Sequence, residues 1–71
     1  MMEQKYNAVV KRSGKWWIGW IEEVPGVNCQ ERTRAELLKS LRVTLKEAIK
    51  FNRTEARRAA GKGFKELTIA V

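Results

Sequence analysis

The chain has 71 residues, with 15 Lys and Arg against 8 acidic residues, so its formal net charge at pH 7 is +7. All 8 acidic residues are glutamates, and the chain has no histidine. This composition removes His-based acid–base catalysis, the Ser-His-Asp arrangement and the aspartate clusters that hold catalytic Mg²⁺. We therefore expect a protein that is not an enzyme and has no cofactor and no metal site.

The length predicts one domain over residues 1–71, near the lower limit at which a single hydrophobic core is stable without help. Cys29 is the single cysteine, which excludes an internal disulfide and fits a reducing compartment. The first residues lack the apolar core of a signal peptide, and no apolar run approaches the ~20 residues of a membrane span. We expect a cytoplasmic protein that has no membrane partner and gains stability as a homo-oligomer, either a dimer or a tetramer.

Two strands are predicted near the N-terminus. Residues 6–12 alternate apolar and polar side chains, Ser13-Gly14 predicts a turn, and residues 16–21 contain three tryptophans. Alternation places the side chains of Trp16, Ile18 and Trp20 on one face of the second strand. Those of Trp17 and Ile21 lie on the other, so both faces need cover. The sequence does not decide which face a helix covers.

Pro25-Gly26 ends the second strand, and residues 27–30 predict a short third one. Thr33 followed by Glu36 is the capping-box pattern for a helix start. Leucines at helical spacing then predict a helix over residues 34–60 that stops at Gly61 or Gly63. Residues 64–71 alternate again and predict a closing strand. The expected fold class is α+β, a two-layer β-β-β-α-β arrangement with an antiparallel sheet and one long helix.

The predicted helix is longer than the predicted strands. At 1.5 Å per residue it spans ~40 Å, whereas strands of six or seven residues span ~20–24 Å. Either the helix breaks near residues 52–54, or its second half packs on a neighbouring subunit. We favour the second alternative, because the apolar periodicity does not shift at Asn52.

The central part of the chain, roughly residues 6–49, resembles the HicB-like antitoxin family, in its short stand-alone (UPF0150-type) form. The features that carry the resemblance are the aromatic strand, the acidic pair before Val-Pro-Gly-Val, the short polar strand and the Thr-led helix with its glutamate. They stand here at residues 16–20, Glu22–Glu23, residues 24–30, and Thr33 with Glu36. The resemblance implies a partial RNase H-like fold and an antitoxin or orphan regulatory role that neutralises or binds a small toxin-like protein.

Full-length members of that family usually carry a C-terminal DNA-binding domain, and the sequence after residue 60 is too short to predict one. A toxin of the corresponding kind is similar to a small double-stranded-RNA-binding domain and is expected to be basic. The net charge of this chain would repel such a partner at long range, so an acidic patch would have to dock it. Glu22 and Glu23 beside the tryptophan strand form that patch.

The tryptophan strand has three interpretations. One face belongs in the core under the helix, and the other is either a protein interface or a base-stacking platform. We favour the interface, since Lys11, Arg12 and Lys15 cluster at the turn instead of alternating with the aromatic residues. The predicted protein-interface residues are Trp16, Trp17, Trp20, Glu22 and Glu23.

A row of cations gives the alternative function, sequence-nonspecific binding of nucleic acid. At about 100° per residue, six side chains fall within a sector of roughly 80° beside the leucine face of the helix. The other interpretation is an ordinary solvated helix face, with Glu36–Lys39 and Glu47–Lys50 as i,i+3 partners. The row, called the basic stripe below, consists of Lys39, Arg42, Lys46, Lys50, Arg53 and Arg57.

Overall fold

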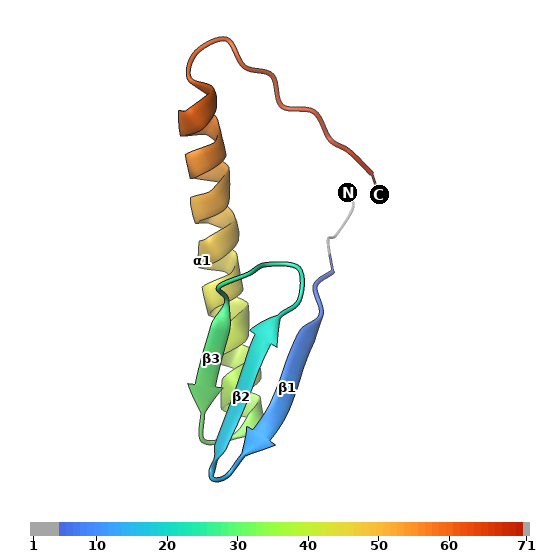
Figure 1. Cartoon of the computed structure of the whole chain (residues 1–71), viewed down its shortest axis with the longest axis vertical. Coiled ribbons are helices and arrows are strands. Elements are labelled where there is room, and N and C mark those ends of the chain that lie inside the picture. Colours follow the sequence, from blue (N-terminus) through green and yellow to red (C-terminus); the bar gives the residue numbers. More distant parts are fainter. Residues whose placement is uncertain (1–4, 71) are drawn as a thin grey trace.

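Consecutive segments of the chain form a three-stranded sheet and one helix. The computed structural model describes residues 5–70. Strands β1 (Ala8–Ser13), β2 (Trp16–Ile21) and β3 (Asn28–Glu31) are followed by helix α1 (Arg34–Ala60). The sheet is antiparallel in the order β1-β2-β3, and α1 lies against one of its faces (Figure 1). The predicted α+β class and the antiparallel meander are thus confirmed.

Local sequence explains both turns of the sheet. Ser13 pairs with Trp16, so the hairpin loop is Gly14-Lys15, one residue later than predicted. Gly14 has a φ of 61°, which is the conformation that the first central position of a type II′ turn requires. After β2, Gly26 with a φ of 89° bends the chain behind Pro25, and β3 then returns beside β2.

Helix α1 begins and ends where the sequence predicts. The Thr33 hydroxyl accepts a hydrogen bond from the backbone N–H of Glu36 at 3.1 Å, and donates one to the Glu36 carboxylate at 3.0 Å. At the other end, Gly61 has a φ of 74° and donates its N–H to the carbonyl of Arg57. The 27 residues between are continuous helix, so the alternative of a break near residues 52–54 is wrong.

The core lies where the first half of α1 crosses the sheet. Buried side chains are Ile21, Val27, Leu37 and Leu41, and the two leucines are at most 2% exposed. Gly19 lets them approach, because a Cβ there would lie 3.1 Å from each leucine side chain and 3.0 Å from the Val9 carbonyl. Gly19 shares its face with Trp17 and Ile21. The helix therefore covers the Trp17 face, and the Trp16, Ile18 and Trp20 face is left uncovered.

The predicted closing strand is absent from the described residues. Residues 64–70 form no strand, and Val71 lies outside the described part of the chain. The reason is geometric, since the uninterrupted helix carries the chain past the end of the sheet and a strand needs an edge to pair with. The molecule measures 50 × 23 × 16 Å with a radius of gyration of 15.2 Å. A globular chain of this length would have about 11 Å, so the structure is unusually elongated.

Candidate protein-interaction surface

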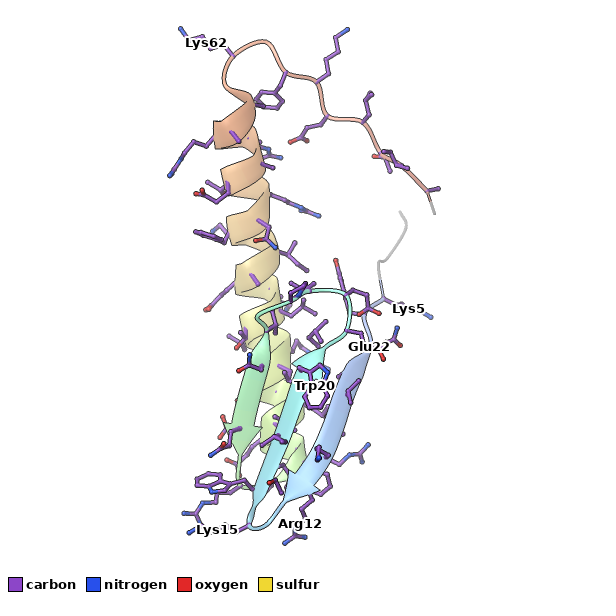
Figure 2. The ribbon with its side chains drawn as sticks, in the orientation of Figure 1. Lys5, Arg12, Lys15, Trp20, Glu22 and Lys62 are labelled. Carbon is purple, nitrogen blue, oxygen red and sulfur yellow. The ribbon has the colours of Figure 1, made fainter. Side chains whose placement is uncertain are left out.

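Within residues 5–70, no helix or strand covers the face of the sheet opposite α1, which forms the candidate site and is called the open face below. Register and alternation place side chains of all three strands on it. Trp16 and Ile18 are half-buried and Trp20 is 40% exposed. Figure 2 shows Trp20 on the side of the sheet away from the helix. The full set is Val9, Lys11 and Ser13 from β1, Trp16, Ile18 and Trp20 from β2, and Asn28 and Gln30 from β3.

Polar residues border the apolar centre of the open face. Ile18 pairs with Lys11 on one side and with Gln30 on the other, and Trp20 pairs with Asn28. Apart from Val9, which pairs with Trp20, the apolar side chains thus lie on the central strand, while charged, hydroxyl and amide groups occupy the two edges. An apolar, aromatic centre inside a polar rim is the composition of a protein–protein interface.

One end of the open face is cationic. The Arg32 guanidinium lies over the Trp16 ring, 4.8 Å from its centroid, within the range of a cation–π interaction. Lys15 lies in the hairpin turn at this end (Figure 2). The contact orients the Trp16 ring, and nothing in the local sequence pattern predicts it, because Arg32 lies in the loop after β3.

The other end of the open face is hollowed and acidic. Between the end of β2 and the Pro25-Gly26 corner lies a shallow depression with Trp20 on its wall. Glu22 stands beside it, and its carboxylate has no hydrogen bond or ion pair within residues 5–70. An incoming cationic group would meet this carboxylate next to an exposed aromatic ring. The residues lining the depression are Trp20, Ile21, Glu22, Pro25, Gly26, Val27 and Asn28.

Glu23, the second predicted acidic residue, has a structural role. Its carboxylate accepts hydrogen bonds from the backbone N–H of Asn7 at 2.8 Å and from the Asn7 side-chain amide at 2.6 Å. These bonds lower the pKa of Glu23 below its ordinary value, the backbone bond contributing most. Glu23 thereby fastens the loop after β2 to the chain entering β1. Glu22 is the acidic residue left for a partner.

The structure puts Trp17 away from the other predicted interface residues. It packs against the core on the helix-covered face, opposite Glu31, whose carboxylate accepts a hydrogen bond from Ser40 of α1 at 2.7 Å. Trp17 is therefore part of the packing between sheet and helix. The open face retains Trp16 and Trp20, with Glu22 at its end.

All six residues of the basic stripe are exposed along α1, as the helical spacing predicts. Arg57 forms an ion pair with Glu66, which raises the pKa of Arg57 and lowers that of Glu66, mainly through their hydrogen bond. The expected Glu36–Lys39 and Glu47–Lys50 pairs are not formed in the described chain, where the other ion pair joins Arg58 to Glu55. The other five stripe cations form no ion pair in the described chain, although the charge of Arg53 also acts on Glu66.

Among residues 5–70, no three His, Cys or acidic side chains come close enough to hold a metal ion. Within the same residues, no helix is both long enough and apolar enough to cross a membrane. Cys29 is a half-buried free thiol whose sulfur lies 3.5 Å from the Thr44 hydroxyl.

No protein-family model, no curated protein and no solved structure matches this chain. The function is therefore inferred from the geometry of the open face and of the helix.

Proposed function

We propose that this protein is a non-enzymatic interaction module of HicB-like type that self-associates and binds a small partner protein through its open face. The observation that carries the proposal is the aromatic centre of the open face. Trp16, Ile18 and Trp20 share one face of the central strand, and no helix or further strand of residues 5–70 covers that face. Removing such a surface from water on binding stabilises a complex, and aromatic side chains dominate such binding energies.

The charge distribution around the open face favours a partner with its own cationic group. The chain as a whole is strongly basic. Glu22 is nevertheless an unpaired carboxylate beside Trp20 and the depression at the Pro25-Gly26 corner. A basic side chain of the partner would pair with Glu22 while an apolar group covers Trp20. In the antitoxin-like or orphan regulatory role that the resemblance implies, that partner is a small toxin-like protein.

The test is capture of the tagged protein from a lysate of its own source, with and without nuclease, followed by mass spectrometry. We expect a small, nuclease-resistant partner at near-equal ratio. The double substitution Trp16→Ser/Trp20→Ser should abolish its recovery. Phe51→Ser is the matched control, because Phe51 is an exposed aromatic residue on α1, away from the open face. Equal recovery with all three proteins would contradict the proposal.

The second candidate function is binding of nucleic acid by the basic stripe, favoured by the five stripe cations that form no ion pair among residues 5–70. From Lys39 to Arg57 the stripe runs ~27 Å along a straight helix. Its last four cations, from Lys46 to Arg57, line a shallow groove together with Ile49 and Thr54. Cations in a row bind the phosphate backbone without reading sequence, and their affinity falls steeply with salt.

Charge reversal separates this candidate from a solvated helix face. Arg42→Glu/Lys46→Glu/Arg53→Glu should abolish binding of duplex DNA and of single-stranded RNA, measured by fluorescence anisotropy over a salt series. The matched control is Arg34→Glu/Arg58→Glu/Lys62→Glu, which changes the net charge equally but lies off the stripe. If the control weakens binding as much as the stripe variant does, only net charge matters and the stripe is not a site.

A further inference from the structure

The chain after α1 carries the two most exposed large hydrophobic side chains of residues 5–70. Leu67 and Ile69 are each 83% exposed, and they alternate with polar and small residues as in a half-buried strand. The described part of this segment, residues 64–70, pairs with no strand. We propose that residues 64–70 add as a fourth strand to the free edge of β1 in a second copy of this chain, and that two copies exchange these strands.

The first residues after α1, up to Glu66, are held against the end of the helix. Gly61 and Gly63, with φ values of 74° and 79°, turn the chain back. Phe64 then lines a small hollow with Ala56 and Ala60, and Glu66 pairs with Arg57. The segment thus leaves the helix in a fixed direction, and its apolar residues come after the point of attachment.

Residues 64–70 cannot pair with the sheet of their own copy over more than one or two residues. Ala48 is the last helix residue packed against the core, and 12 more residues carry α1 ~18 Å beyond it. Residues 64–70 span ~23 Å when extended. The return therefore uses nearly the whole segment and leaves ~5 Å, one or two residues, for pairing. Figure 1 shows the segment running back from the helix end and stopping short of the strands.

The edge of β1 offers the backbone groups that a fourth strand needs. Glu22 donates its N–H to the Asn7 carbonyl at 3.0 Å, which fixes the alternation of the β1–β2 ladder. Ala8, Val10 and Arg12 consequently direct their N–H and C=O groups away from β2. β1 is also the longer of the two sheet edges, with six residues against four in β3. An unpaired edge of this kind accepts an added strand.

The position of α1 leaves apolar space beside β1 and not beside β3. The helix packs mainly on β2 and β3, and Thr44 on one flank contacts Cys29 of β3. The opposite flank, turned about 40–80° from Leu41 towards β1, carries Leu38, Leu45 and Ile49. Leu38 is 40% exposed. A strand beside β1 would place Leu67 and Ile69 under this flank and complete the second layer.

Because each copy both donates a segment and offers an edge, the exchange closes as a two-fold dimer. Strand exchange explains how the self-association in the proposed function takes place. It rests on the self-association alone and not on binding of a partner protein. The exchange uses the edge and the helix-covered side of the sheet, so the open face stays available to a partner.

The first test is the mass of the full chain in solution, measured by light scattering over a range of concentrations. We expect twice the mass of one chain, and half of that value for Leu67→Ser/Ile69→Ser. The control Thr68→Ser/Ala70→Ser alters the other face of the same segment and should leave the dimer intact. A full chain that stays monomeric, or one mass for all three proteins, overturns the inference.

A second test distinguishes exchange from a strand that returns to its own sheet. In a Cys29→Ser background, Lys11→Cys is placed on β1 of one protein and Thr68→Cys on the segment of another. After mixing, a short thiol-specific crosslinker should join the two proteins. In a chain that carries both cysteines, crosslinking confined within single chains overturns the inference.

The same measurements separate this inference from the open-face proposal. Trp16→Ser/Trp20→Ser should leave the dimer mass unchanged while partner capture is lost. If those substitutions abolish the dimer and Leu67→Ser/Ile69→Ser does not, copies associate through the open face and strand exchange is wrong. If the dimer depends on Leu67 and Ile69 but no partner is captured, strand exchange stands and the open-face proposal fails.

Discussion

The two halves of α1 have the same local structure but opposite surroundings. The first half contains Leu37 and Leu41, both buried against the sheet. The second half contains no buried residue, and Phe51 within it is 63% exposed. Both halves are continuous helix, because intrahelical hydrogen bonds and good helix-forming residues need no partner. The length of this helix is therefore set by local sequence, while its burial is set by how far the sheet extends along it.

Truncation of the core leucines should produce the largest effect. Leu41→Ala removes a buried side chain from a core of four residues and should cost about 2–5 kcal/mol of unfolding free energy. Phe51→Ala, in the exposed half, should change the unfolding free energy by no more than about 0.5 kcal/mol. Urea denaturation followed by circular dichroism measures both. Equal losses would mean that the two halves are equally packed in solution.

Gly19 tests how closely the first half of α1 approaches the sheet. Gly19→Ala places a Cβ 3.0 Å from the Val9 carbonyl and 3.1 Å from both core leucines, so helix or strand must shift. We expect a loss of about 1–3 kcal/mol, typical of overpacking, in the same denaturation assay. Gly14→Ala is a useful reference, because a Cβ there meets no neighbour and acts only through the positive φ of the turn. An unchanged midpoint for Gly19→Ala would show that the helix packs more loosely than described.

Loss of the helix cap should have a smaller effect. Thr33→Ala removes the acceptor for the Glu36 N–H and should cost about 1 kcal/mol. Thr33→Ser keeps the hydroxyl and should retain most of the stability. The cap adjoins the packed half of α1, so the loss should appear in the midpoint of global unfolding. Equal midpoints for the two variants would mean that the hydroxyl is not used.

The smallest effect concerns pH and compares two carboxylates. Hydrogen bonds from Asn7 lower the pKa of Glu23 below 4.5. The ionised Glu23 carboxylate therefore stabilises the folded state above that pH. The effect is lost as the pH falls through the lowered pKa, when the carboxylate is protonated. In the Glu23→Gln variant, the free energy of unfolding should therefore change less between pH 6 and pH 3 than in the unmodified protein, measured by urea denaturation at both pH values. Glu66 also has a lowered pKa, through Arg57, but it joins only segments outside the core. Glu66→Gln should leave the pH dependence of global melting unchanged.

Prediction from sequence succeeded where a few neighbouring residues determine the backbone. Thr33 with Glu36 predicts the helix start, and its end is predicted at Gly61 or Gly63 and lies at Gly61, because capping bonds join residues three or four apart. The Pro25-Gly26 corner likewise follows from proline geometry and a glycine with positive φ. The prediction of a closing strand failed, because alternation describes what residues 64–70 can do but not whether an edge lies within reach.

For the candidate site, the sequence likewise predicts the residues that share a strand face, but not the contacts between remote segments. Trp16 and Trp20 were assigned to one face of β2 by alternation alone, and the structure keeps them together. Trp17 and Glu23 were grouped with them by proximity in sequence, and long-range contacts give each another role. The cation–π contact of Arg32 with Trp16 joins a loop to a strand that lies well before it in the sequence, so no local sequence pattern predicts it.

Short-range sequence patterns specify the three strands and the helix of this protein, their order and the helix face that carries its leucines. Turns, caps and side-chain periodicity are local, and their energies arise between residues a few positions apart. The tertiary structure is needed to show which tryptophan face the helix covers. It is also needed to show that residues 64–70 pair with no strand edge of their own copy. Those outcomes depend on the close approach that Gly19 permits and on how far an unbroken helix carries the chain, and both are distances between segments remote in sequence.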